Sequence, residues 1–185
     1  MVSSLLVLGG ARSGKSRFAV ASQPTHGRVT FIATARAGDA DMAARIARHR
    51  AERPSAWATV EEPFDLVGRL TTIARAADAV LVDCLTVWAA NRMLRGDRDE
   101  AILAEADALA ELMRRRLCPL TFVSNEVGAG VHPDSTDGLR FRDLLGLVNQ
   151  RVAAAADRVV LMVAGLPLDV KATPRESPIS AVQAG

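Results

Sequence analysis

The sequence predicts an α/β protein whose mostly parallel sheet carries helices on both faces. Short apolar runs alternate with longer Ala- and Arg-rich stretches of helical period. The apolar runs are nearly continuous, which is typical of strands buried on both faces of a parallel sheet. A glycine-rich loop joins the first apolar run to the first helical stretch, as expected for a strand–loop–helix unit.

Each predicted element follows from a local signal. Strands are expected at 5–8, 29–33, 79–82, 120–124 and 158–163, the last clear one. Helices are expected at about 14–21, 39–53, 100–117 and 142–156. Glycines end the first strand, and Pro54 ends the second helix, because the residue before a proline disfavours helical geometry. The helix at 100–117 is amphipathic, with apolar residues recurring at helical spacing.

Length and composition limit the organisation and the class of protein. The 185 residues, 49% of them hydrophobic and 24% charged, fit one globular domain, which we place at 1–171. The segment 172–185, rich in Pro and Ser, is expected to be a mobile tail. A net charge of +2 argues against a dedicated nucleic-acid binder. No apolar run is long enough for a membrane span and no signal peptide is evident, so we expect a cytoplasmic location.

Two cysteines, Cys84 and Cys118, are too few for a disulfide framework or a zinc site. Both lie in apolar surroundings, which predicts buried free thiols.

A phosphate-binding loop is the strongest motif. The stretch Gly9, Gly10, Ala11, Arg12, Ser13, Gly14, Lys15 and Ser16 matches G-x-x-x-x-G-K-[ST]. Its glycines let the backbone N–H groups turn toward one phosphate cluster, and the following helix begins at the anion. Lys15 is one of only two lysines beside 21 arginines, and it reaches the β- and γ-phosphates of a nucleotide.

A Mg²⁺ ion is expected beside this loop. The two predicted ligands of this ion are the Ser16 hydroxyl and the carboxylate of Asp83, which directly follows the apolar run 80–82. The alternative for Asp83 is a carboxylate that caps a helix or stabilises a turn.

One histidine stands out. Arg45, His49 and Arg53 have i, i+4, i+8 spacing on a predicted helix, and Arg50 lies in the same turn. Such a face can bind a polyphosphate, and the neighbouring cations favour the neutral imidazole that attacks phosphorus. The alternative is a solvated basic face with an incidental histidine.

Taken together, the motifs resemble the bifunctional adenosylcobinamide kinase/adenosylcobinamide-phosphate guanylyltransferases. The matching blocks run in order from residue 3 to about 171: the phosphate loop, 32–34, 41–46, 49–50, 53–61, 125–133, 141–151, 156–157 and 163–171. The resemblance implies a P-loop NTPase fold of the RecA-like kind and a homotrimer. It also implies nucleotide contacts from Thr34, Arg53, Glu61 and Asp83.

The family's reactions supply the functional expectation. The enzyme phosphorylates adenosylcobinamide with ATP or GTP, then moves GMP from GTP onto that phosphate through a guanylylated histidine, here His49. The product, adenosylcobinamide-GDP, belongs to the assembly of the nucleotide loop of cobalamin. Two transfers at different phosphorus atoms fit a γ-phosphate cradle together with a separate nucleophile.

Other functions remain open at this point. One alternative is a P-loop kinase of another small hydroxylated metabolite, without guanylyltransferase activity. Another is a nucleotide-dependent switch, although the sequence has no obvious N-K-x-D stretch. Glu126 follows an apolar strand and is expected either to contact a substrate or to stabilise a turn.

Overall fold

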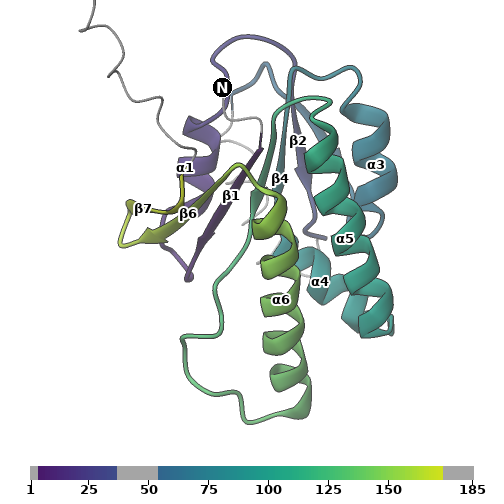
Figure 1. Ribbon diagram of the computed structural model, residues 1–185, viewed down its shortest axis with the longest axis vertical. Coiled ribbons are helices and arrows are strands. Elements are labelled where there is room, and N and C mark those ends of the chain that lie inside the picture. The colour runs from purple at the N-terminus through teal and green to yellow at the C-terminus, as the bar shows by residue number, and fades with distance from the viewer. Residues whose placement is uncertain (1–3, 37–53, 173–185) are drawn as a thin grey trace, which may run out of the picture.

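The computed structural model describes residues 4–36 and 54–172. These residues form a seven-stranded sheet in the order β3-β2-β4-β5-β1-β6-β7 (Figure 1). The strands are β1 (Ser4–Gly9), β2 (Val29–Ala33), β3 (Ala58–Glu61), β4 (Ala79–Asp83), β5 (Leu120–Val123), β6 (Arg158–Val163) and β7 (Leu166–Lys171). All neighbouring strands are parallel except β7, which pairs antiparallel with β6 at one edge.

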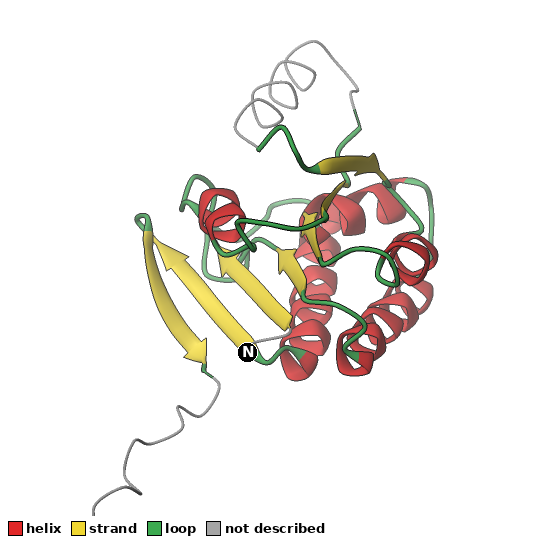
Figure 2. Cartoon of the chain, turned by 90° about the horizontal axis from the view of Figure 1, so that it is seen from above, coloured by secondary structure: helices red, strands yellow, loops and turns green. Residues whose placement is uncertain are grey.

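Helices cover both faces of the sheet. They are α1 (Lys15–Ala21), α3 (Leu66–Ile73), α4 (Leu85–Leu94), α5 (Asp99–Arg115) and α6 (Thr136–Ala155). The short α1 lies on one face, and α3, α4, α5 and α6 form a layer on the other (Figure 2). This arrangement confirms the predicted α/β class.

The strand pleat divides the core into two clusters, because successive side chains point to opposite faces. Leu5 and Val7 pack on the α1 side with Ala19, whereas Leu6 packs on the other side with Trp88. Every one of these side chains is less than one tenth exposed. The near-continuous apolar strands in the sequence are the result of this two-sided burial.

Several predictions need correction. The strand at 158–163 is not the last, since β7 follows after a turn at Ala164 and Gly165. All six residues of β7 are exposed, so the strand lacks the apolar run used to find the others. α6 begins at Thr136, six residues before the predicted start, because Ser135 caps it by accepting a hydrogen bond from the Gly138 N–H.

Three elements, β3, α3 and α4, are not predicted from the sequence. β3 is a mostly exposed edge strand, and α3 begins at an N-cap, Asp65, whose carboxylate accepts from the Gly68 N–H at 2.9 Å. α4 follows β4 after a single residue, Cys84. The helix predicted at 39–53 lies outside the described residues, as does the predicted tail apart from Ala172. Within the described chain, no helix is both apolar and long enough to traverse a bilayer.

Candidate functional site: the carboxyl edge of the sheet

Five neighbouring parallel strands lie side by side, and residues near their carboxyl ends pair with one another across the sheet. Val7, Val123, Asp83, Ala33 and Glu61 are successive partners across the sheet. The segments that follow these residues therefore leave the sheet at the same edge. In open α/β sheets this carboxyl edge is where ligands bind.

The phosphate-binding loop leaves β1 at this edge and turns sharply into α1. Gly9, Arg12 and Gly14 all have positive φ angles, of 151°, 56° and 94°. Inside the loop the Ser13 N–H donates to the Gly10 carbonyl at 3.3 Å, and Gly14 occupies the N-cap of α1 with no side-chain cap. No side chain caps this end of the helix, and a helix N-terminus of this kind favours an anion such as a phosphate.

Two side chains of the loop are buried. Lys15 is 8% exposed, and its Nζ donates to the Gly10 carbonyl at 2.5 Å, across the loop. The Ser13 Oγ is buried and has no hydrogen-bond partner in the described structure. A buried hydroxyl without a partner is costly, and a phosphate oxygen in the loop would satisfy it.

The turn between β6 and β7 packs against the phosphate-binding loop. The Gly165 N–H donates to the Ser13 carbonyl at 3.0 Å. A Cβ on Gly14 would lie 3.4 Å from the Cα of Gly165, so the two backbones are in contact. The antiparallel strand that the sequence analysis missed thus helps to hold the loop in shape.

Asp83 and Ser16 fit the expected Mg²⁺ role. The Asp83 carboxylate is half-buried at the end of β4, and the Ser16 hydroxyl is half-buried in the first turn of α1. Neither group makes a hydrogen bond or ion pair with another residue of the described ranges. No cluster of three or more His, Cys, Asp or Glu side chains that could enclose a metal occurs at the described positions. Mg²⁺ at nucleotide sites usually takes one or two protein ligands and completes its shell with phosphates and water.

Thr34 is fully buried, and its hydroxyl binds backbone. Its Oγ1 donates to the Cys84 carbonyl and accepts from the Cys84 N–H, both at 2.8 Å. It follows Ala33, so the pleat turns it toward α4 and away from the face of Asp83. The hydroxyl thereby holds the Asp83–Cys84 peptide, which is cis. Glu61 is exposed, two strand spacings from Asp83 in the same row, or roughly 10 Å.

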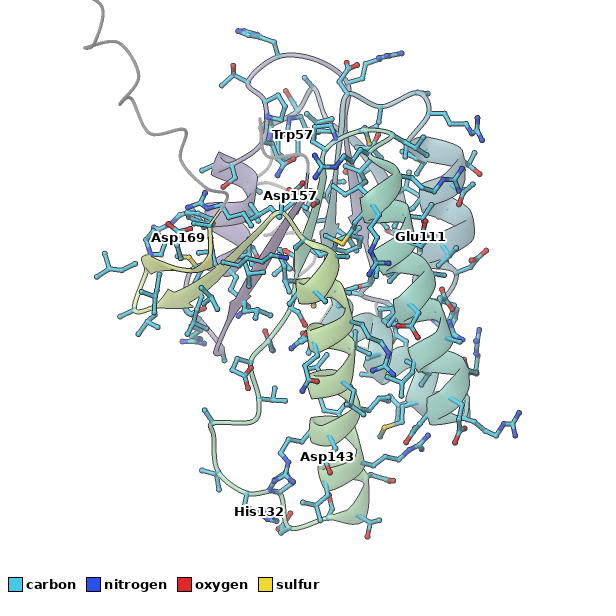
Figure 3. All side chains as sticks on the ribbon, viewed as in Figure 1. Trp57, Glu111, His132, Asp143, Asp157 and Asp169 are labelled. Atoms are coloured by element: carbon cyan, nitrogen blue, oxygen red, sulfur yellow. The ribbon has the colours of Figure 1, made fainter. Side chains whose placement is uncertain are left out.

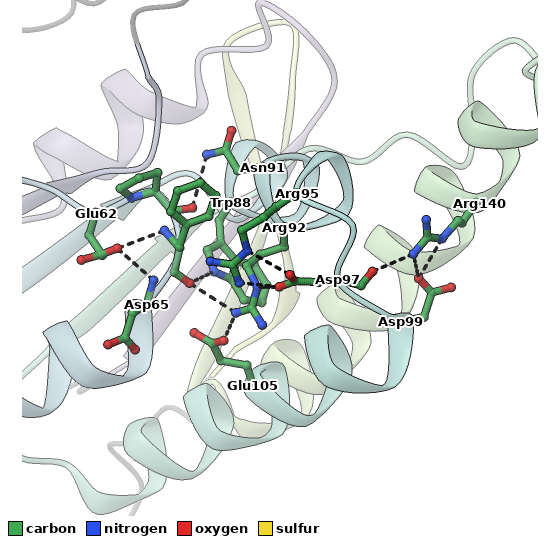
Figure 4. A network of polar contacts seen from close by, with 12 residues as sticks. Glu62, Asp65, Trp88, Asn91, Arg92, Arg95, Asp97, Asp99, Glu105 and Arg140 are labelled. Carbon is green, nitrogen blue, oxygen red and sulfur yellow. Dashed lines mark hydrogen bonds and ion pairs between the residues drawn. The ribbon is translucent and has the colours of Figure 1, made fainter.

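A polar network holds the turn between β3 and α3 against α4 (Figure 4). The Trp88 indole N–H and the buried Arg92 both donate to the Phe64 carbonyl, and Arg92 also forms ion pairs with Asp97 and Glu105. The Arg95 guanidinium lies 4.5 Å from the centroid of the Phe64 ring. Trp88 is fully buried and is therefore a core residue.

Asn91 joins this network to the carboxyl edge. Its Nδ2 donates to the Thr34 carbonyl at 2.8 Å and to the Pro63 carbonyl at 3.3 Å. The ends of β2 and β3 are thus tied to one side chain of α4.

The two cysteines are free thiols, as predicted. Cys118 is buried and Cys84 is half-buried beside Asp83. Desolvation raises the pKa of both thiols to about 11, and the charge of Asp83 adds to the effect at Cys84. Both therefore stay protonated at neutral pH and are poor nucleophiles.

Two of the three histidines lie within the described residues, and both are exposed. His26 lies in the turn after α1, and His132 lies on the long segment before α6, at the opposite end of the molecule from Trp57 (Figure 3). The third, His49, lies outside the described residues together with Arg45, Arg50 and Arg53.

A comparison with family models shows which protein family the chain belongs to. Residues 5–170 match the model described as cobinamide kinase / cobinamide phosphate guanyltransferase. The chain belongs to this family. The match spans β1 to β7 and includes both the phosphate-binding loop and the segment that carries His49.

Relatives in the cobinamide kinase family align over almost their whole length. The bifunctional adenosylcobalamin biosynthesis protein CobP of Pseudomonas aeruginosa is 44% identical over 170 residues, covering 91% of this chain and 98% of its own. Bifunctional adenosylcobalamin biosynthesis proteins named CobU, from Escherichia coli and Salmonella typhimurium, are each 39% identical over 179 residues. Each alignment covers 90% of this chain and 99% of the relative.

The fold recurs in an ATPase of the type III secretion system of pathogenic bacteria. The two structures superpose with a TM-score of 0.57 at 12% identity, over 90% of this chain. The chain spans only 56% of that ATPase chain, so the likeness concerns the fold alone. It confirms the predicted P-loop NTPase fold for this member of the cobinamide kinase family.

Glu126 stabilises a turn in this family member. Its Oε1 accepts from the Gly128 N–H at 2.7 Å, and its own N–H donates to the Gly9 carbonyl at 3.0 Å. Of the two roles left open by the sequence, the structure supports the turn-forming one.

Three residues at this edge have no role predicted from the sequence: Thr86, Asn149 and Gly165. Thr86 and Asn149 are polar residues less than one tenth exposed, on α4 and α6, and both bind the backbone of Asn125. In the sequence, the available signal was a polar residue, Thr86 or Asn149, within an apolar stretch. Its partner, the backbone of Asn125, becomes evident only once the order of the strands in the sheet is known.

Proposed function

We propose that this protein phosphorylates the hydroxyl of adenosylcobinamide with ATP or GTP and then transfers GMP from GTP to that phosphate. The product would be adenosylcobinamide-GDP, an intermediate in the assembly of the nucleotide loop of cobalamin. The proposal rests on one observation above all: a complete phosphate-binding loop lies at the same carboxyl edge of the sheet as Asp83, in a chain 44% identical to a bifunctional relative.

The loop supports the phosphoryl transfer. Its backbone N–H groups and Lys15 would surround the β- and γ-phosphates, and the unpartnered Ser13 hydroxyl would donate to one of their oxygens. To reach a phosphate, the Lys15 ammonium would exchange its bond to the Gly10 carbonyl for a phosphate oxygen. That exchange replaces a neutral acceptor with a charged one, which gives a stronger hydrogen bond.

Asp83 and Ser16 would hold the Mg²⁺ that accompanies the nucleotide. Bound there, the ion would neutralise charge on the β- and γ-phosphates. Thr34 would act by fixing the Asp83–Cys84 peptide, and thus the direction of the carboxylate. We retain Glu61, Arg50 and Arg53 as proposed nucleotide contacts.

His49 would carry the guanylyl group. Its neutral imidazole would attack the α-phosphorus of GTP, the bond to the pyrophosphate oxygen would break, and the flanking arginines would stabilise the charge that develops. The phosphate of the corrinoid would then displace the imidazole. This role rests on the residue spacing and on the family, since His49 lies outside the described residues.

A labelling experiment tests the guanylyl transfer. The protein is incubated with GTP labelled at the α-phosphate, and the denatured protein is examined for an acid-labile adduct. We expect an adduct in the wild type and none in His49→Ala. His26→Ala and His132→Ala serve as matched controls because both residues are exposed. If the wild type forms no adduct, the guanylyltransferase assignment is wrong and a plain metabolite kinase is favoured.

We also propose a homotrimer acting in the cytoplasm. Three side chains of β7 support self-association: Leu166, Leu168 and Val170 are 71%, 58% and 62% exposed. With Val163 of β6 they form an apolar surface at a sheet edge, a place where uncovered strands tend to associate. Sedimentation of the purified chain at micromolar concentration should give three times the 19.7 kDa monomer mass. A monomer would contradict the proposal.

A further inference from the structure

Asn125 lies between the two strands that carry the reactive groups. It follows β5, which pairs with β1 on one side and β4 on the other. The chain continues along β1 beyond the strand: the Ser124 N–H donates to the Val7 carbonyl at 2.9 Å and the Glu126 N–H to the Gly9 carbonyl at 3.0 Å. Asn125 is therefore held level with the first residue of the phosphate-binding loop.

The pleat places the Asn125 side chain on the face of α1. Val123 packs in the cluster on the α1 side and Phe122 in the cluster on the other side. Because the chain stays extended along β1, Asn125 has the same orientation as Val123. The same alternation along β4 puts Asp83 on this face, two residues after Leu81. Asn125 and Asp83 thus share the face on which α1 begins.

The backbone of Asn125 is fixed on both sides by buried side chains. Its N–H donates to the Thr86 Oγ1 at 2.7 Å, and its carbonyl accepts from the Asn149 Nδ2 at 3.0 Å. Thr86 and Asn149 are 8% and 6% exposed. Two buried polar groups from two different helices thus restrain this one residue.

The side-chain amide of Asn125, in contrast, is not used by the fold. It makes no hydrogen bond to any other residue of the described chain, and Asn125 is only half-buried. A rigid backbone with an uncommitted amide is the arrangement expected of a residue that contacts a ligand.

We propose that Asn125 is a catalytic residue of the phosphoryl transfer, with its Nδ2 donating to a non-bridging oxygen of the γ-phosphoryl group. This inference rests on the proposed kinase function. In the step, the acceptor hydroxyl oxygen bonds to the γ-phosphorus, and the bond from phosphorus to the β,γ-bridging oxygen breaks. Its electron pair stays on the nucleoside diphosphate, and the hydroxyl proton is released to water. A neutral donor suits this position, because it binds the transferring group without adding a second carboxylate beside Asp83.

The test compares Asn125→Ala and Asn125→Asp with the wild type. Asn125→Asp has nearly the same shape but loses the donor, so it addresses catalysis even if the smaller side chain disturbs the loop. Gln150→Ala is the matched control, because it removes an exposed amide from α6. For each protein, kcat and KM are measured for phosphorylation of adenosylcobinamide by ATP, together with the Kd of ADP.

We expect kcat to fall about 100-fold in both Asn125 variants, as for other single donors to a transition state. The KM of ATP should change less than about threefold, and the Kd of ADP less than about twofold, because ADP lacks the group that Asn125 contacts. A kcat within about threefold of the wild type would overturn the inference. A parallel loss of ADP affinity would also overturn it by showing a structural role. If the wild type itself forms no phosphorylated corrinoid, the proposed function fails and this inference fails with it.

Discussion

Gly9 and Gly10 offer a pair of alanine substitutions whose effects should differ widely. A Cβ on Gly9 would lie 2.6 Å from the Met162 carbonyl oxygen and 2.6 Å from the Ser13 Oγ. The φ of Gly9 is also +151°, a conformation that residues with a side chain rarely adopt. A Cβ on Gly10 would meet no atom within 4 Å.

The expected cost follows from these contacts. Overpacking costs about 1–3 kcal/mol, and an unfavourable backbone conformation adds about 1–3 kcal/mol. Met162 belongs to the β1–β6 ladder, so moving its carbonyl would disturb the hydrogen bonds of the sheet. Gly9→Ala should therefore destabilise the protein by about 2–6 kcal/mol. This corresponds to a Tm lower by about 4–24 °C in a chain of this size. Gly10→Ala should stay within about 0.5 kcal/mol of the wild type.

Thermal unfolding followed by circular dichroism measures both variants under the same conditions. Similar Tm values for Gly9→Ala and Gly10→Ala would refute the reasoning, because they would mean that β6 does not pack against the start of the loop as described.

Two further predictions concern the loop and the polar network. Lys15→Ala should reduce phosphorylation of adenosylcobinamide by at least about 100-fold, because the charge on the transferring phosphoryl group loses its cation. Wild-type turnover in that variant, measured as labelled phosphate in the corrinoid, would contradict the role of the loop. The pKa of Asp97 is lowered to about 2 from its ordinary 3.8, chiefly by the hydrogen bond from Arg95 and further by Arg92. A carboxylate with a depressed pKa stabilises the fold above its unfolded pKa, and this contribution disappears as the pH falls through the folded value. Asp97→Asn should therefore lower the urea midpoint at pH 6 and flatten its decline between about pH 4 and pH 2; an unchanged pH profile would show that the ion pairs of Asp97 contribute nothing.

The parts of the fold that the sequence predicted are those with a buried, locally periodic pattern. The bounds of β2 match the predicted 29–33, and β6 matches 158–163, because both are flanked by turns and are largely buried. β3 and β7 lie at the two edges of the sheet and are largely exposed, so they carry no apolar run. α4 was missed because it begins one residue after β4, which leaves no loop signal between strand and helix.

In the candidate site, too, the residues that could be predicted are those with a local signal in the sequence. The phosphate-binding loop and Asp83 could be predicted, because a motif and a strand end are local features. Asn125 could not, because its position depends on β5 lying between β1 and β4. It also depends on hydrogen bonds between its backbone and the side chains of Thr86 and Asn149, which are far away along the chain. The burial of Thr34 against Cys84 is also a consequence of strand order, since the two residues are 50 positions apart in the sequence.

Product analysis of the wild-type protein tests the central claim most directly. The protein is incubated with adenosylcobinamide and ATP, then with GTP, and the corrinoids are separated and identified by mass spectrometry. We expect adenosylcobinamide phosphate in the first step and adenosylcobinamide-GDP in the second. Formation of the phosphate without the GDP derivative would contradict the second half of the function, and recovery of unmodified adenosylcobinamide would contradict all of it.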